Sequence, residues 1–277
     1  MKKFRITISL LSLTLLFNLS MALPGFASSY YSWDGPNKTP WSDVNKTWNG
    51  GDYNMCWAAA ASNILAWGGW GTRDLDTAGE IFSDFKQHWT DYGSLPYIGW
   101  QWWLDGVAEV PTDSLWWSRP QNPADPGGGH WKGVYQFEDY FYSWTSGAST
   151  LQAVDYCLHN GYGVTLAIQL NGGTGGHALT VWGYDYSTEV DQYYTNLWVT
   201  DSDDNYDGEV PGLVSYPLTW DPGRETWWLG GHYQSYCIGE VQALGQRPTP
   251  VPAALLLFAS GLAGLREYGR RRFSRKA

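Results

Sequence analysis

A run of small and apolar residues at positions 57–67 gives the clearest helical signal in the chain. It contains four consecutive alanines and a leucine, which favour helix, and two glycines at 68 and 69 end it. A polar turn that contains glycine, residues 49–52, precedes the run. The pattern therefore predicts a helix whose N-terminus lies at Cys56.

A second helix is predicted over residues 149–160. Ser149 and Gln152 have the spacing of a capping box, apolar residues recur on one face, and Gly161 follows. Cys157 lies near the end of this helix, at an ordinary core position.

Two apolar runs in the second half of the chain predict buried strands. His177 opens the first run, 178–184, directly after a glycine-rich loop, and a polar segment separates this run from the second, 196–199. The second run leads into Asp201 and Asp203, which share one face under the alternation of a strand. A late strand-like run at 233–241 contains Cys237.

The N-terminal residues have the pattern of a secretory signal peptide. A basic start is followed by the apolar run 6–16 and by small residues near Ala27. We expect residues 1–27 to form the signal, with cleavage after Ala27 and Ala22 as the second choice. A membrane anchor is the alternative, but the run is short for a span.

The C-terminal residues 246–277 contain a proline motif, the short apolar segment 253–265 and a cluster of arginines at 270–272. This order resembles the PEP-CTERM sorting signal of Gram-negative bacteria. The resemblance implies a short membrane segment held by cytoplasmic arginines, and handling by an exosortase-type processing enzyme. It implies a cell-surface or extracellular location. A plain tail anchor is the alternative.

Charge is segregated along the chain. The net charge is −10 overall, but the bases are concentrated at the two ends, so that residues 29–245 carry −19. Such an acidic body repels nucleic acid and anionic membranes, which excludes them as partners except through the C-terminal segment. Residues 28–245 fit one domain with a full core.

Three cysteines in an exported protein leave at least one thiol unpaired. Cys157 and Cys237 could form a disulfide or remain two separate thiols. Cys56 differs because the start of a helix stabilises an anion, which favours the reactive thiolate. A structural cysteine before a helix is the alternative.

A nucleophilic cysteine needs a base, and the base needs an orienting group. Among five histidines, His177 is the best candidate because a strand fixes its backbone next to a glycine-rich loop. Asp201, at the end of the next strand, is placed to accept the Nδ1–H of His177 and to hold the ring toward Cys56.

The segment 41–52 with Cys56, and the segments 176–185 and 199–203, resemble the catalytic regions of the immunoglobulin-degrading Mac/IdeS cysteine peptidases. The resemblance implies that Cys56 is the nucleophile, His177 the base and Asp201 the orienting acid. It implies that Asp203 supports the site and that Lys46 helps to stabilise the oxyanion.

The resemblance further implies an α+β papain-like cysteine peptidase fold, with a helical N-terminal half and an antiparallel β C-terminal half. The expected function is a secreted or surface endopeptidase that acts on a protein or peptide substrate through a thioester, without a cofactor. Trp57 stands where the immunoglobulin-degrading enzymes have glycine, so immunoglobulin cleavage does not follow.

Two alternatives stay open. The acidic residues 201–208 could hold calcium in a loop, although the spacing is not that of an EF-hand; no zinc site is expected. The chain could also be a non-catalytic matrix or glycan-binding protein on a papain-like scaffold, if its clustered tryptophans are exposed platforms rather than core. These are Trp100, Trp102, Trp103, Trp116, Trp117, Trp227 and Trp228.

Overall fold

The protein is described by a computed structural model. It describes residues 28–32, 40–47, 50–107, 110, 117–171, 175–187, 194–204 and 212–248. The chain divides into two compact units, Met1–Gln246 and Arg247–Ala277, and all the helices and strands given below belong to the first.

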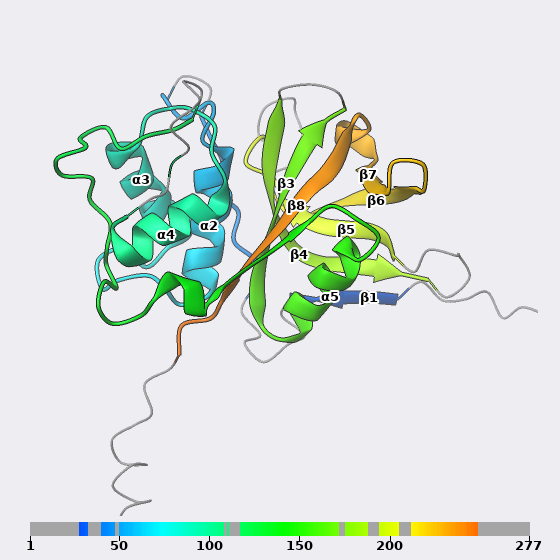
Figure 1. Ribbon diagram of the computed structural model, residues 1–277, viewed down its shortest axis with the longest axis horizontal. Helices are drawn as coiled ribbons and strands as arrows, with labels where there is room; N and C mark the ends of the chain where they lie inside the picture. The colour runs from blue at the N-terminus through cyan, green and yellow to red at the C-terminus, as the bar shows by residue number, and fades with distance from the viewer. Residues whose placement is uncertain are drawn as a thin grey trace, which may run out of the picture. The chain divides into compact units, whose positions relative to one another are not determined.

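Three helices from the first half of the chain form one side of the described fold (Figure 1). They are α2 (Cys56–Trp67), α3 (Ala78–His88) and α4 (Pro96–Asp105). Helix α2 packs against α3, α4 and strands β3 and β4, and almost every residue of it is buried. Its small alanines allow this close packing on all sides. The helix that begins with Cys56 is therefore held rigidly between the other helices and the sheet.

The strands form one antiparallel sheet in which six strands close into a barrel, because β4 pairs with both β3 and β5. The order around the barrel is β4-β3-β8-β7-β6-β5. These strands are β3 (Tyr162–Leu170), β4 (Gly176–Tyr186), β5 (Tyr194–Thr200), β6 (Val214–Asp221), β7 (Thr226–Leu229) and β8 (Tyr236–Gly245).

Two further strands extend the sheet, and one more helix lies against it. Strand β1 (Ser28–Tyr31) pairs with the second half of β4, and β2 (Phe141–Thr145) pairs with β8. Helix α5 (Thr150–His159) connects β2 to β3 and packs on β3 and β8. Two short 3₁₀ helices, η2 (Phe137–Asp139) and η3 (Gly231–Tyr233), complete the described elements.

The expected papain-like fold is wrong. The strands do not form an open β half that faces a helical half, because six of them close into a barrel. The division into halves fails as well, since β1 precedes the helices in the chain and α5 lies among the strands. Alternating apolar residues reveal a half-buried strand, but they do not reveal that β4 will pair with β5 to close the sheet.

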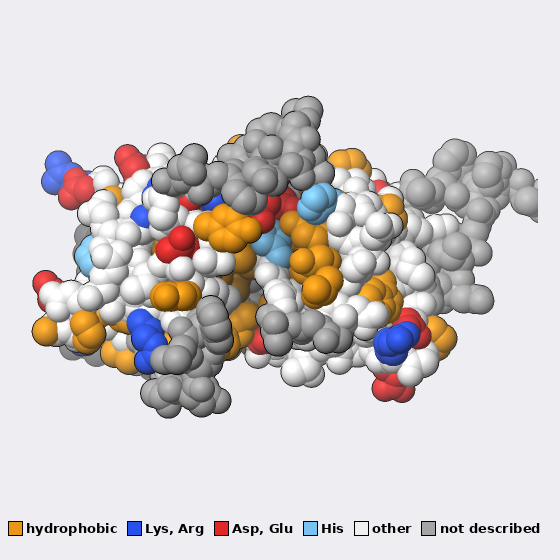
Figure 2. All heavy atoms as spheres, turned by 90° about the horizontal axis from the view of Figure 1, so that it is seen from above, with side chains coloured by type: hydrophobic (Ala, Val, Ile, Leu, Met, Phe, Trp, Pro, Cys, Tyr) orange, Lys and Arg blue, Asp and Glu red, His pale blue; other side chains and the backbone are white. Residues whose placement is uncertain are grey.

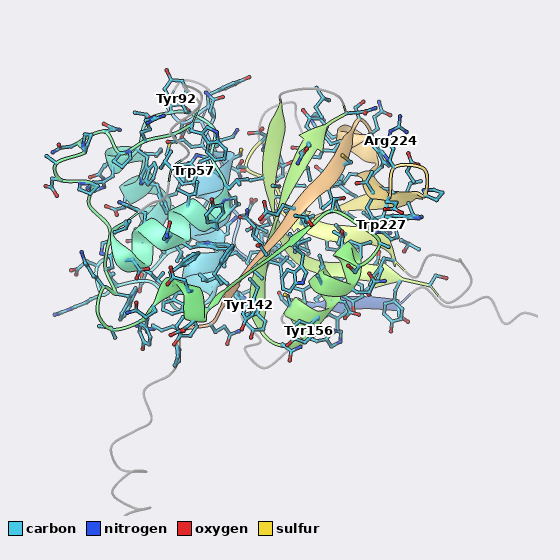
Figure 3. All side chains as sticks on the ribbon, in the orientation of Figure 1. Trp57, Tyr92, Tyr142, Tyr156, Arg224 and Trp227 are labelled. Atoms are coloured by element: carbon cyan, nitrogen blue, oxygen red, sulfur yellow. The ribbon has the colours of Figure 1, made fainter. Side chains whose placement is uncertain are left out.

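Two hydrophobic cores stabilise this arrangement. One lies among α2, α3 and α4, and the other lies between α5 and the inner face of the barrel. Trp57 belongs to the first core and Trp227 to the second (Figure 3). Trp100, Trp102 and Trp103, expected as candidate platforms, are fully buried, as the core interpretation requires. Trp116 lies outside the described residues.

The predicted helices and strands around the candidate site are confirmed, but the predicted capping box is wrong. The first predicted helix begins at Cys56, and the second is confirmed as α5. The capping box is wrong: Ser149 makes no capping bond with its side chain, and the Thr150 hydroxyl instead bonds to the backbone of Gly147. The strands after His177 and before Asp201 are confirmed as β4 and β5.

The predicted signal peptide, 1–27, lies outside the described residues, and so does the predicted C-terminal segment 246–277 except for its first three residues. The apolar segment 253–265 belongs to the part that is not described. Within the described ranges, each helix is too short or too polar to cross a bilayer.

Candidate active site

Cys56 is the first residue of α2, and only 9% of it is exposed. The first N–H groups of a helix have no acceptor within the helix. Those of Cys56 and Trp57 find none elsewhere among the residues that the structure describes. The thiol therefore lies beside backbone donors and at the positive end of the helix dipole, and both stabilise negative charge.

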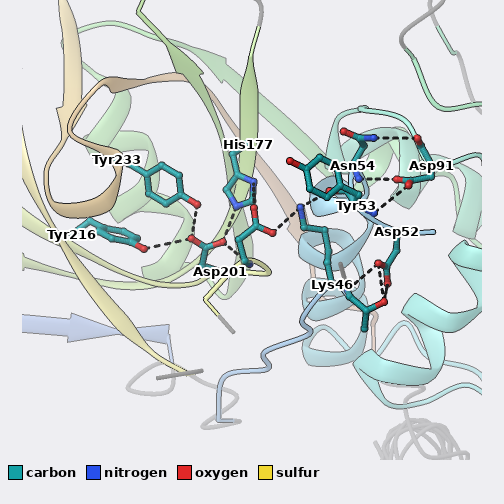
Figure 4. Close-up of polar contacts among 11 residues, drawn as sticks. Lys46, Asp52, Tyr53, Asn54, Asp91, His177, Asp201, Tyr216 and Tyr233 are labelled. Carbon is teal, nitrogen blue, oxygen red and sulfur yellow. Dashed lines mark hydrogen bonds and ion pairs between the residues drawn. The ribbon is translucent and has the colours of Figure 1, made fainter. Parts of the chain in front are cut away.

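Pairing between β4 and β5 brings His177 and Asp201 together. Thr180 of β4 pairs with Thr200 of β5, so the residues at the adjoining ends of the two strands lie side by side. The Nε2 atom of His177 lies 2.7 Å from Oδ1 of Asp201 (Figure 4). We expected Nδ1 to make this bond, and that detail is wrong: Asp201 takes Nε2, which leaves Nδ1 for Cys56.

Cys56 and His177 interact through a hydrogen bond and through charge. Burial by itself raises the pKa of the Cys56 thiol, but the charge of His177, their hydrogen bond and the charge of Lys46 outweigh burial and lower it overall. Burial lowers the pKa of His177, but the charges of Asp201 and Cys56 raise it well above 6.5. The favoured state is therefore a thiolate beside an imidazolium.

Asp201 is a fully charged partner for this pair. Its burial favours the neutral acid, but the charge of His177 and bonds from His177 and Tyr233 lower the pKa of Asp201 to about 2. Its Oδ2 accepts hydrogen bonds from Tyr233, at 2.6 Å, and from Tyr216, at 3.4 Å. The backbone N–H of Asp203 donates to its Oδ1 at 3.0 Å.

Lys46 and Asp203 lie on the other side of the imidazole. The Lys46 Nζ atom is 2.7 Å from Asp203 Oδ1 and donates to the carbonyl of Tyr53 at 2.7 Å. Asp203 Oδ2 lies 3.6 Å from His177 Nδ1. Burial lowers the pKa of Lys46, but the charges of Cys56 and Asp203 outweigh it and raise the pKa, so Lys46 stays protonated.

The backbone around Lys46 is fixed by two sets of contacts. The N–H of Lys46 donates to the carbonyl of Ser202, which ties the segment to the end of β5. The buried Asp52 accepts hydrogen bonds from the N–H and the hydroxyl of Thr47. The lysine therefore approaches the thiol from a segment anchored to both the barrel and the helical part.

The turn before the nucleophile is anchored to the helical part as well. The carboxylate of Asp91 accepts the backbone N–H groups of Tyr53 and Asn54, and the Asn54 side chain donates to the Asp91 carbonyl (Figure 4). The indole of Trp57 donates to the carbonyl of Tyr92 at 3.0 Å. These contacts fix the direction from which the chain enters α2.

All five residues expected at the site are thus brought together by the structure. The space-filling view shows histidine and acidic side chains near the middle of one face, with hydrophobic side chains on both sides (Figure 2). Tyr53 and Tyr92 are among the large apolar residues that are exposed.

The other two cysteines have different surroundings. Both are free thiols, so the disulfide alternative is wrong for this structure. Burial without a nearby positive charge raises the pKa of Cys157 to about 12. Cys237 is half-buried in β8, with its thiol toward the carbonyl of Gln169. Of Cys56 and Cys157, only the first lies in surroundings that favour the thiolate.

Three of the site residues also have the composition of a metal centre. His177, Asp201 and Asp203 each offer a ligand atom within 4.8 Å of the others. In this structure Asp203 pairs with the Lys46 ammonium, and the His177 ring is hydrogen-bonded on both sides. The two carboxylates already pair with positively charged groups, and the imidazole is already hydrogen-bonded to Asp201 and Cys56, so the arrangement fits proton transfer better than metal binding. The calcium alternative concerns residues 201–208, and of these 205–208 lie outside the described residues.

Sequence reasoning missed three residues that lie near Asp201 or the imidazole of His177. Tyr233 and Tyr216 come from η3 and β6, and the sequence signal for Tyr233 is only the pair of glycines before it. Asp43 lies close to Asp204 and Asp201; burial and these two negative charges raise its pKa to about 7.

The chain matches no protein-family model and no curated protein.

Proposed function

We propose that the chain is a secreted or surface cysteine endopeptidase, with Cys56 as nucleophile, His177 as proton carrier and Asp201 as the residue that orients His177. The observation that carries this proposal is the buried thiol at a helix N-terminus, hydrogen-bonded to an imidazole whose far nitrogen lies 2.7 Å from a carboxylate. A nucleophile, a base and an orienting acid in contact form the arrangement that thiol acyl transfer requires.

The reaction follows from these positions. The thiolate of Cys56 attacks the carbonyl carbon of a peptide bond, and the carbonyl oxygen becomes an oxyanion. His177 then gives its Nδ1 proton to the leaving amine, which departs and leaves a thioester on Cys56. His177 next accepts a proton from water, the resulting hydroxide equivalent attacks the thioester, and the acid product leaves with the thiolate restored.

The oxyanion is the species that needs stabilisation. The N–H of Cys56 is a donor without an acceptor among the described residues, and the Lys46 ammonium lies close enough to lower the pKa of the thiol. A backbone N–H and a fixed cation stabilise the oxyanion more than the neutral carbonyl, and removing one such donor costs roughly a hundred-fold or more in turnover.

The first experiment is labelling of the folded protein with iodoacetamide and with an epoxide thiol probe at pH 6, read by mass spectrometry. Cys56 should react first, and Cys157 should stay unlabelled because its thiol is protonated. Cys56→Ala should abolish fast labelling, and His177→Ala should slow it. Cys157→Ala is the matched control and should leave it unchanged. Labelling of Cys56 no faster than that of Cys237 would contradict the proposal.

A second experiment addresses the reaction itself. A screen of denatured proteins and immunoglobulins should identify at least one protein that is cleaved, and this cleavage should be abolished by Cys56→Ala and left intact by a metal chelator. Loss of cleavage on chelation would instead favour a metal at His177, Asp201 and Asp203. A protein that binds glycans unchanged after Cys56→Ala and cleaves nothing would favour the matrix-binding alternative.

The proposed setting comes from the two terminal segments. A signal peptide at 1–27 and a PEP-CTERM-like segment at 246–277 would place the enzyme at the surface of a Gram-negative bacterium, after handling by an exosortase-type enzyme. The likeness of the site motifs to Mac/IdeS peptidases supports thiol chemistry and leaves the substrate to the screen above.

A further inference from the structure

Tyr233 makes two separate contacts with the proposed catalytic group, one through its hydroxyl and one through its ring. The hydroxyl donates to Asp201 Oδ2 at 2.6 Å. The ring stacks on the imidazole of His177, with 5.5 Å between centroids and 20° between planes. Only 4% of Tyr233 is exposed, so water does not compete for either contact.

The two oxygens of Asp201 have different partners. Oδ1 accepts from His177 and from the backbone N–H of Asp203, whereas Oδ2 accepts from Tyr233 and Tyr216. A carboxylate held at one oxygen can rotate about its Cβ–Cγ bond, and a donor on the second oxygen prevents that rotation. Tyr233 makes the shorter bond to Oδ2 and therefore contributes more than Tyr216.

The backbone holds Tyr233 at this point. Gly231 begins η3 with a φ of +64°, a conformation that glycine adopts without strain, and the N–H of Gly230 donates to the carbonyl of Pro217 in β6. Burial and the charge of Asp201 raise the pKa of the Tyr233 hydroxyl, so the hydroxyl stays protonated and can donate to Asp201 at neutral pH.

We propose that Tyr233 is a positioning residue that fixes the Asp201 carboxylate through its hydroxyl and the His177 ring through its face, so that Nδ1 stays directed at Cys56. The inference rests on the proposed function. Among the described contacts, Tyr233 meets Asp201 and His177 and not the thiol of Cys56, so we expect it to act through Asp201 and His177. Free rotation of the imidazole would interrupt proton transfer to the leaving amine without weakening substrate binding.

Two variants separate the two contacts. Tyr233→Phe keeps the ring and removes the hydroxyl, whereas Tyr233→Leu removes both. Tyr216→Phe removes the longer bond to the same oxygen and should have a smaller effect. Tyr156→Phe, at an exposed position on α5, is the matched control for loss of a tyrosine hydroxyl. Thermal unfolding of each variant shows whether the fold is kept.

The test uses a readout that does not depend on turnover. With ¹⁵N-labelled histidine, the Nε2-bound proton of His177 should give a downfield resonance that His177→Ala removes and that exchanges slowly with water. Tyr233→Phe should speed this exchange, and Tyr233→Leu should broaden the resonance further. An exchange rate in Tyr233→Phe equal to that of the wild type would overturn the inference.

Kinetics then connect the positioning role to the reaction. In Tyr233→Phe we expect kcat to fall about ten-fold with KM unchanged, since one hydrogen bond to a charged group is lost. A kcat equal to that of the wild type would also overturn the inference. If the exchange rate changes but even the wild type cleaves no peptide, the endopeptidase proposal fails and the positioning role stands.

Discussion

Lys46 and Asp203 form an ion pair of 2.7 Å in which the lysine is buried and the carboxylate is 38% exposed. The pair lies between the segment before α2 and the end of β5, and Lys46 also donates to the carbonyl of Tyr53. Asp203 thus holds the ammonium in place without taking it away from Cys56, whose pKa the ammonium lowers.

Lys46→Met should therefore make the thiol less acidic. The fixed positive charge is lost, the pKa of Cys56 rises, and the pH at which Cys56 alkylation reaches half its maximal rate moves upward. Turnover should fall about a hundred-fold, because the oxyanion loses a charged donor. The measurement is the rate of iodoacetamide labelling of Cys56 from pH 4 to 10, together with kcat on a cleaved peptide.

Lys132→Met is the matched control, since it removes an exposed lysine of the helical part. It should leave both the pH profile of Cys56 labelling and kcat unchanged. A Lys46→Met curve that coincides with the wild-type curve would show that the ammonium does not act on the thiolate.

The Asp201–His177 contact should appear in the stability of the protein in acid. The pKa of Asp201 is lowered from 3.8 to about 2, so its contribution to stability is present above about pH 4 and is lost as the pH falls toward 2. The shift corresponds to about 2 kcal/mol of unfolding free energy. The unfolding free energy of the wild type, measured in urea, should fall by this amount between about pH 4 and pH 2.

Asp201→Asn should flatten this limb of the stability curve, because the variant has no carboxylate to protonate. Its difference in unfolding free energy from the wild type should be largest above pH 5 and smallest near pH 2. Asp125→Asn, at an exposed position, serves as the control. Parallel curves for Asp201→Asn and the wild type would refute the assignment of the acid limb to this residue.

The packing of α2 on the barrel should set the geometry between Cys56 and His177. A Cβ added to Gly163 of β3 would lie 2.6 Å from a methyl group of Ile64 in α2. Ile64 is fully buried. Gly163→Ala should therefore destabilise the protein by about 1–3 kcal/mol and displace α2 from the barrel. Urea unfolding and the rate of Cys56 labelling would both record the change.

Gly79→Ala provides the comparison, because nothing lies within 4 Å of its added Cβ and it stands in α3. It should stabilise the protein by roughly 0.5–1 kcal/mol. If Gly163→Ala is as stable and as reactive as Gly79→Ala, the interface between α2 and β3 does not control the site.

Cys56, His177 and Asp201 could be predicted from sequence because each stands at the end of a strong local pattern, whereas Lys46 and Asp203 were expected only through the resemblance to the Mac/IdeS peptidases. Cys56 opens an alanine-rich helix, and His177 opens an apolar strand. Tyr233 and Tyr216 could not be found in this way. Their role depends on where η3 and β6 lie around the barrel, and no local pattern encodes that position.

The overall fold was harder to predict than the site for the same reason. The helix at Cys56 and the strands around His177 and Asp201 are local features, and the structure contains them. Closure of the barrel depends on which strands pair with each other: β4 pairs with β5 on one side and with β3 on the other. The predicted orientation of the imidazole was wrong as well, because the periodicity of the sequence does not specify which ring nitrogen bonds to a carboxylate.

Closure of the barrel has a consequence for the time at which the thiol becomes reactive. Cys56 comes early in the chain, whereas its partners His177 and Asp201 meet only when β4 and β5 have paired and α2 has docked on them. Until then the thiol keeps the ordinary cysteine pKa of about 8.5 and is mostly protonated at neutral pH. The unfolded chain therefore carries little thiolate at Cys56, and nucleophilic reactivity first arises in the completed fold.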